Sequence, residues 1–88
     1  MQTINLENEC TIYEVAEKQQ LIMGLWSDQK TDVSFDLSAI SEIDVCFIQL
    51  LISCKKTALK NNVKFEVVNI PDEVTNKITS AHLTEQLL

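Results

Sequence analysis

The chain has 88 residues, which predicts one small domain spanning residues 1–88 and leaves no room for a second domain. A domain of this size buries roughly 60–65% of the surface of its unfolded chain. A hydrophobic content of 45%, with one Gly and one Pro, is typical of a compact domain rich in regular structure and excludes a disordered chain. The net charge of −6, without a cluster of basic residues, argues against recognition of the phosphate backbone, so we expect no nucleic-acid partner.

The sequence also lacks the features of a membrane or secreted protein. No apolar run reaches the roughly 18 residues of a membrane span, and the start MQTINLENE does not resemble a signal peptide. We therefore expect no direct insertion into a membrane. The three cysteines are an odd number, which favours reduced thiols and a cytoplasmic location.

The first predicted elements are a strand and an amphipathic helix. Apolar and polar residues alternate over residues 2–6, which predicts a short strand with one buried face. Thr11 stands three residues before Glu14, the spacing of a capping box, so the first helix is expected to begin at Ile12. Its apolar positions recur at helical spacing. A polar connection follows over residues 27–31.

A central strand and a buried helix come next. Residues 33–37 alternate between apolar and polar, which predicts a half-buried strand, and a turn is expected over residues 38–44. The almost unbroken apolar segment that opens at Val45 covers too much of a helical circumference for a surface helix. Asp44 stands directly before it, where a carboxylate accepts backbone N–H bonds and faces the positive end of the helix dipole.

The last third of the chain predicts a return to the sheet. Asn61 and Asn62 are the best candidates to end the buried helix in a left-handed conformation. Residues 63–67 alternate again, and a right-handed crossover makes this third strand parallel to the central one. Pro71 fits the first position of a final helix. Because the strands alternate, we expect a two-layer α/β domain with helices packed mainly on one face of the sheet.

The residues offer little for catalysis. His82 has no identifiable nucleophile nearby, the three cysteines lack the spacing of a zinc site, and a single glycine excludes a glycine-rich phosphate loop. We expect no enzyme, no metal site and no cofactor. Cys46 leaves one alternative open, a thiol redox sensor, because a helix N-terminus favours the reactive thiolate, although the nearby Asp44 opposes that effect.

The segment DLSAISEIDVCFIQLL resembles the central motif of STAS domains, the anti-anti-sigma-factor fold, in which a strand leads through a turn to Asp-Ser-Ser-Gly-Leu or Asp-Thr-Ala-Gly-Leu and the next helix. The flanking segments ECTIYEVAEKQQLI and VKFEVVNIPDEV are similar to the family's first helix and to its late strand with the following helix. The likeness covers nearly the whole chain and is closest to stand-alone members associated with bacterial signalling and chemotaxis. It implies a four- or five-stranded mixed sheet with helices, and a non-enzymatic binding module.

The resemblance also implies a docking surface around the start of the second helix. Its partner would be a protein such as a serine kinase of the anti-sigma type or a chemotaxis signalling protein, and in many members that partner phosphorylates a Ser or Thr of the motif. Here Asp44 matches the motif, but Val45 and Cys46 stand at the Ser or Thr positions and Phe47 replaces the Gly. We therefore expect no phosphorylation at this position, and contact residues Asp44, Val45, Cys46, Phe47 and Gln49.

Several alternatives stay open at this point. Phe47 either forms an exposed apolar patch with Val45, as an aromatic anchor for a partner, or turns into the core. The main alternative function is that of an accessory STAS subunit on an ABC transporter ATPase of the phospholipid-transport type. The redox sensor acting through Cys46 and a carrier of a small molecule are two more.

Overall fold

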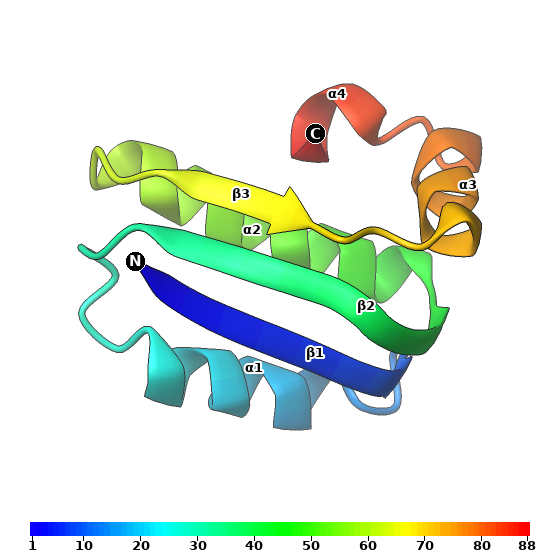
Figure 1. Cartoon of the computed structure of the whole chain (residues 1–88), viewed down its shortest axis with the longest axis horizontal. Coiled ribbons are helices and arrows are strands. Elements are labelled where there is room, and N and C mark those ends of the chain that lie inside the picture. The colour runs from blue at the N-terminus through cyan, green and yellow to red at the C-terminus, as the bar shows by residue number, and fades with distance from the viewer.

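A computed structural model describes all residues from 1 to 88. Its elements follow in the order β1 (Gln2–Cys10), α1 (Val15–Leu25), β2 (Val33–Ile43), α2 (Val45–Lys60), β3 (Phe65–Val68), α3 (Asp72–Ser80) and α4 (Thr84–Leu87). The strands lie side by side in the order β1-β2-β3, and both neighbouring pairs are parallel (Figure 1). The predicted parallel relation of the third strand to the central one is confirmed.

The prediction of a four- or five-stranded mixed sheet is wrong, because the sheet has three strands and all of them are parallel. Each strand is joined to the next through a helix, α1 or α2, which returns the chain to the same end of the sheet and so keeps the strands parallel. After β3 the chain forms helices only.

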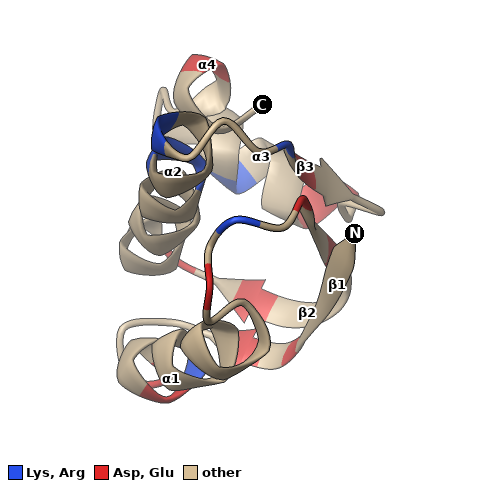
Figure 2. Cartoon of the chain, turned by 90° about the vertical axis from the view of Figure 1, so that its left-hand side faces the viewer, with Lys and Arg blue, Asp and Glu red and all other residues tan.

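The helices lie on one side of the sheet, as Figure 2 shows. The side chains that β1 turns toward them are buried, whereas its intervening residues Asn5, Glu7 and Glu9 are exposed on the opposite face. A parallel sheet is usually covered on both faces, so an open polar face is uncommon for this arrangement. The two-layer architecture agrees with the alternation that the strands show in the sequence.

The predicted turn over residues 38–44 is wrong, because β2 continues through it to Ile43. The buried residues of this stretch, Leu37, Ile40 and Ile43, are three apart rather than two. The pairing with β1 explains the spacing, since its register shifts twice, from Asn5↔Asp36 to Glu7↔Ala39 and from Asn8↔Ile40 to Glu9↔Glu42. Each shift adds one residue to β2, as in a β-bulge, and so keeps the apolar side chains on the buried face.

The first helix begins at Val15, three residues later than predicted, and residues 12–14 form a turn. Thr11 Oγ1 donates a hydrogen bond to Glu14 Oε1 at 2.9 Å, so the carboxylate binds the hydroxyl instead of a backbone N–H group. The reciprocal pair of bonds that defines a capping box is therefore not made. Ile12, where the helix was expected to begin, is 55% exposed.

The second helix lies in the core, as predicted from its apolar circumference. Six of its residues are buried: Phe47, Ile48, Leu51, Ile52, Cys54 and Ala58. After it, Asn62 adopts the left-handed conformation with φ of 58°, and Pro71 directly precedes α3. No helix of the fold combines the length and the apolar character that crossing a membrane requires.

Two buried thiols make the stability of the fold sensitive to alkaline pH. Burial raises the pKa of Cys54 to about 11, and it also raises the pKa of Cys10. In the unfolded chain these thiols ionise from about pH 8.5 upward, whereas the folded chain keeps them protonated. The free energy of unfolding should therefore hold below that pH and fall as the pH rises toward 11, with Cys54 accounting for roughly 2–3 kcal/mol.

Urea unfolding at several pH values tests this expectation. The matched variant is Cys54→Ala, which removes the titrating group and should show a shallower alkaline loss of stability than the parent. Parallel curves for the two proteins would contradict the role given to Cys54.

Candidate binding site at the start of the second helix

Asp44 joins two segments at the carboxyl end of β2. Its Oδ1 accepts the N–H of Phe47 at 3.0 Å, which confirms the predicted cap of α2. Its Oδ2 accepts the N–H of Ile12 at 2.8 Å, in the loop between β1 and α1. Its own N–H donates to the carbonyl of Cys10 at 3.3 Å. One carboxylate therefore fixes both the start of α2 and the path of a loop 32 residues away in sequence.

Exposed side chains, most of them apolar, surround this carboxylate. In the loop, Ile12 is 55% and Tyr13 92% exposed, and on the first turn of α2 Val45 is 49% exposed. Cys46 and Gln49 are exposed on the same helix. We call these five residues the junction surface: Ile12, Tyr13, Val45, Cys46 and Gln49. Exposed apolar and aromatic side chains gathered in one place are typical of interaction sites.

Phe47 does not belong to this surface, because its side chain is 0% exposed and packs in the core. The interpretation of Phe47 as an exposed aromatic anchor is therefore wrong, and the alternative in which it turns into the core is confirmed. The helix periodicity explains the difference, since Phe47 shares its face with the buried Leu51 and Cys54 while Val45 and Gln49 point away from the core. Phe47 can shape the binding surface only from beneath.

The remaining candidate groups are scattered. All three cysteines are free thiols; Cys46 is exposed, whereas Cys10 and Cys54 are buried. His82 is exposed in the turn between α3 and α4, with φ of 59°. No three acidic, histidine or cysteine side chains lie close enough together to hold a metal ion. The redox hypothesis for Cys46 stays a prediction.

Asp36 has a structural role near the carboxyl end of the sheet. Its Oδ1 accepts a hydrogen bond from the N–H of Ser38 at 2.9 Å, and its Oδ2 accepts one from Asn69 Nδ2 at 2.9 Å. These hydrogen bonds hold the pKa of Asp36 below its ordinary value, and the bond from the Ser38 backbone has the largest effect. The side chain thus joins β2 to the segment that follows β3.

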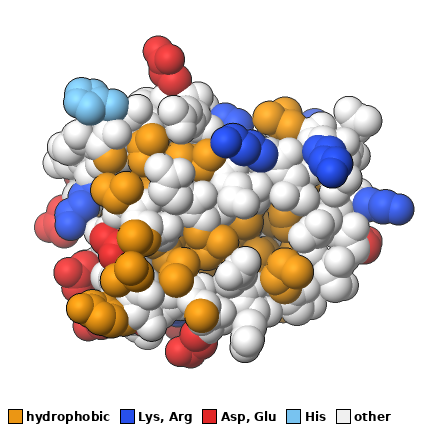
Figure 3. All heavy atoms as spheres, turned by 180° about the vertical axis from the view of Figure 1, so that it is seen from behind, with side chains coloured by type: hydrophobic (Ala, Val, Ile, Leu, Met, Phe, Trp, Pro, Cys, Tyr) orange, Lys and Arg blue, Asp and Glu red, His pale blue; other side chains and the backbone are white.

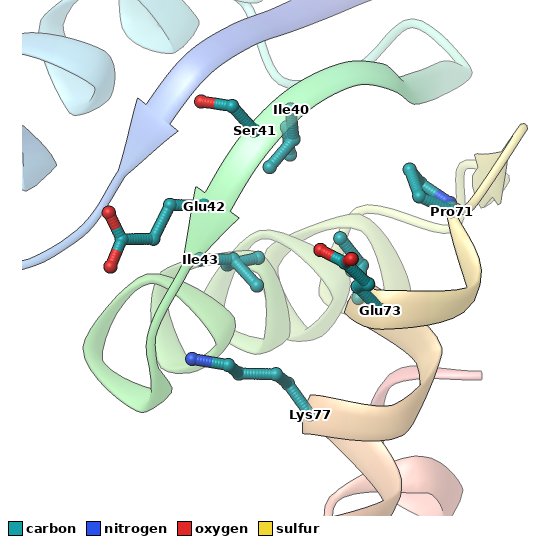
Figure 4. A pocket seen from close by; sticks show the side chains of 8 residues that line it. Ile40, Ser41, Glu42, Ile43, Pro71, Glu73 and Lys77 are labelled. Atoms are coloured by element: carbon teal, nitrogen blue, oxygen red, sulfur yellow. The ribbon is translucent and has the colours of Figure 1, made fainter.

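A groove lies beside the junction surface, between the carboxyl end of β2 and α3 (Figure 4). Its first part, of about 300 Å³, is lined by Ile40, Ser41, Glu42, Ile43, Pro71, Glu73, Val74 and Lys77. Its second part, of about 530 Å³, is lined by Val45, Glu73, Asn76, Lys77, Ser80 and Ala81. The two parts share Glu73 and Lys77, and we call them together the junction groove.

Val45 connects the two features, since it belongs to the junction surface and also lines the groove. Sequence reasoning singled out Val45 but missed the loop residues and the wall of the groove that α3 contributes. Pro71 and the two acids after it do indicate the start of α3, the helix that forms this wall, just after a strand. That pattern does not tell where the helix packs.

One family model, described as STAS domain, matches residues 3–87 of the chain. The match includes all but the first residue of β1 and every later element, and therefore both the junction surface and the junction groove. No curated protein matches the chain.

Proposed function

Because the chain belongs to the STAS-domain family, we propose that it is a non-enzymatic binding module that regulates a partner protein in a bacterial cytoplasmic signalling pathway. Domains of this family generally mediate protein–protein interactions. The observation that supports a binding role here is the junction surface, where Ile12, Tyr13 and Val45 are exposed around a carboxylate that fixes the backbone beneath them.

The geometry of the junction suits protein recognition. Asp44 holds the loop and the helix start in one arrangement, so the exposed side chains lose little backbone freedom when a partner binds. Tyrosine is among the residues most often found at the energetic centre of interfaces, and Tyr13 is almost wholly accessible. Asp44, Val45, Cys46 and Gln49 are therefore the proposed contact residues, with Ile12 and Tyr13 added and Phe47 as their buried support.

The proposed contact is constitutive rather than switched at the family's phosphorylation position. Val45 and Cys46 carry no hydroxyl group where the motif has Ser or Thr. A phosphate there would add about −1.5 to −2 charges to the docking surface. Without an acceptor hydroxyl, this means of releasing the partner is missing. The partner would be a serine-kinase-like ATPase of the anti-sigma type or a chemotaxis signalling protein.

Capture of the partner from a lysate of the native host tests the class of protein. The tagged chain is used as bait, the retained proteins are identified by mass, and the mass of the bait is checked for phosphate. Retention of an anti-sigma-type or chemotaxis ATPase on an unmodified bait is the expected result. A transporter ATPase, or a bait phosphorylated on α2, would contradict the proposal.

The affinity of that partner for surface variants tests the site. Val45→Asp should weaken binding at least tenfold, because it places a charge in the apolar centre of the junction surface. An acid in the first turn of a helix is favourable to the helix dipole, so the variant is expected to stay folded.

The matched control is Leu59→Asp, which puts the same charge on the opposite end of α2, at a leucine that is 65% exposed. It should leave the affinity within about twofold of the parent, a small change on the scale of interface substitutions. Equal losses for the two variants, or no loss for Val45→Asp, would show that the junction surface is not the interface.

A further inference from the structure

The side of the molecule that α1 and α2 form carries an uncharged groove between these two helices. The groove holds about 70 Å³, and none of the nine side chains that line it is charged. Met23 lines it from α1 and is 51% exposed, and Leu50 and Cys54 line it from α2. Hydrophobic side chains run across the middle of this helical face (Figure 3). The groove is therefore part of an apolar strip that is open to solvent.

Charges of opposite sign stand at the two ends of this strip. Because α1 and α2 each follow a strand of the parallel sheet, both helices start at the same end of the sheet. Their starts, with the turn before α1, carry three acids and one lysine: Glu14, Glu17, Asp44 and Lys18. Their ends, with the connection after α1, carry one acid and four lysines: Asp28, Lys30, Lys55, Lys56 and Lys60. Acids and most lysines are separated in the same way on the helical face (Figure 3).

These two helical segments also differ from the rest of the chain in net charge. Residues 11–31 and 44–60 hold five lysines and four acids, a net charge of +1. The remaining residues hold two lysines and nine acids, a net charge of −7. Two copies of this acidic chain therefore repel each other least when they meet through α1 and α2.

A twofold axis perpendicular to the helical face makes the charge pattern self-complementary. The axis places the lysine end of each copy over the acidic end of the other and brings the two apolar strips together. Across its two longer axes the molecule extends 30 Å by 26 Å. A face of that size has room for the about 800 Å² that each partner buries in a stable interface.

Gly24 is an independent indication of a close contact on this side. A glycine within a helix lowers stability relative to alanine. The φ angle of Gly24 is not positive, and a Cβ atom there would meet no other atom within 4 Å. The helix period places Gly24 on the same exposed side of α1 as Glu17 and Gln20. The isolated chain therefore does not require a glycine here, whereas the close approach of a second backbone does.

From the uncharged groove, the charge pattern and Gly24 we infer that the chain forms a symmetric dimer through the helical face of α1 and α2. Lys56 and Lys60 of each copy lie over the start of α1 in the other copy, and the apolar strips meet near the axis. This inference goes beyond the proposed function. Val45 lines the junction groove, on the side of α2 that faces α3, and stays outside the dimer contact.

Sedimentation velocity of the full chain, from low micromolar to submillimolar concentrations, tests the dimer. A reversible equilibrium between monomer and dimer is the expected result. Added salt should shift this equilibrium toward the monomer, because it screens the charge pairs at the two ends of the contact. A chain that stays monomeric over the whole concentration range would overturn the inference.

Charge reversal tests the arrangement of the two copies. One variant combines Lys56→Glu with Lys60→Glu, and the other combines Glu17→Lys with Gln20→Lys, all at exposed positions. Each variant alone should raise the Kd of the dimer at least tenfold, because like charges then face each other at both ends. A mixture of the two variants should form a heterodimer with a Kd within about threefold of the parent, since opposite charges meet again. A mixture as weak as the separate variants would contradict the twofold arrangement.

The matched control for net charge reverses the two lysines that lie outside these helical segments. Lys64→Glu combined with Lys77→Glu removes the same charge as the first variant and should change the Kd less than about twofold. Losses equal to those of the first variant would reduce its effect to general repulsion between acidic chains and overturn the assignment of the face.

The apolar strip is tested by a charge placed in the groove. Met23→Glu should raise the Kd at least tenfold, because an unpaired carboxylate would be buried at the contact. Leu25→Glu is the matched control, since Leu25 is 44% exposed and lies two turns after Lys18, whose Nζ reaches the carbonyl of Glu7 on the β1 side of α1. Equal effects of the two variants would show that the groove is not at the contact.

A partner protein is the competing occupant of the helical face. A parent chain that stays monomeric, together with a loss of partner affinity in the variant of Lys56 and Lys60, would identify that occupant and overturn the inference. Val45→Asp should leave self-association unchanged, whereas the proposed function predicts that it weakens the partner. The dimer and the proposed function can therefore fail separately.

Discussion

Phe47→Ala should lower the free energy of unfolding by about 3–5 kcal/mol, the range found when a large buried aromatic side chain is removed and leaves a cavity. Phe47 is fully buried on the inner face of α2, where it packs in the core of the domain. Urea unfolding monitored by circular dichroism measures the change. For a domain of this size the loss is a large share of the total stability.

Val45→Ala is the matched control, two residues earlier on the same helix. Val45 is 49% exposed, so its truncation should change the free energy of unfolding by no more than about 0.5 kcal/mol. The two variants thus distinguish a residue that stabilises the fold from one that lies on its surface. Similar losses for the two variants would mean that Phe47 is not part of the core.

Asp44→Ala should cost about 2 kcal/mol of stability, because it removes the cap of α2 and the acceptor for the Ile12 N–H together. The same variant should also weaken partner binding, since the loop that carries Ile12 and Tyr13 loses its attachment to the helix. Urea unfolding and partner affinity are the two measurements.

Asp44→Asn distinguishes the two hydrogen bonds. An asparagine oxygen caps a helix about as well as a carboxylate oxygen, whereas the amide group in the second position cannot accept a hydrogen bond. The amide of Phe47 should therefore stay protected from hydrogen exchange, and the amide of Ile12 should exchange faster than in the parent. Unchanged protection of Ile12 would show that the loop does not depend on Asp44.

The sequence was most informative where local rules decide the structure. The apolar circumference of residues 45–60 predicted the buried helix, and Asp44 predicted its cap. The helix between the second and third strands predicted their parallel pairing. Each of these conclusions depends on residues that are neighbours in the chain or on the handedness of one crossover.

Features that depend on distant residues escaped prediction. The bulges of β2 hid the strand beyond Leu37, because their register shifts are set by the pairing with β1. The hydrogen bond from Ile12 to Asp44 spans 32 residues and holds the turn where a helix start was expected. The junction groove exists only because α3 packs beside the end of β2, and neither segment specifies that contact by itself.

Phe47 shows how a site residue can be identified for the wrong reason. Its position in the STAS-like motif predicted a contact residue at the junction, yet the helix period places its side chain beneath the surface. The loop residue Tyr13 is far more accessible but was not predicted as a contact residue, because no local sequence pattern identifies an isolated exposed tyrosine.

The two hydrogen bonds of Asp44 have a consequence for how this surface can change over evolution. The backbone at the junction is fixed by Asp44 and not by the exposed side chains of Val45, Cys46 or Tyr13, so replacements at these three positions leave those hydrogen bonds in place. Each of these positions is free to acquire new side chains one at a time. A domain built this way can adapt to a different partner without a costly loss of stability along the path.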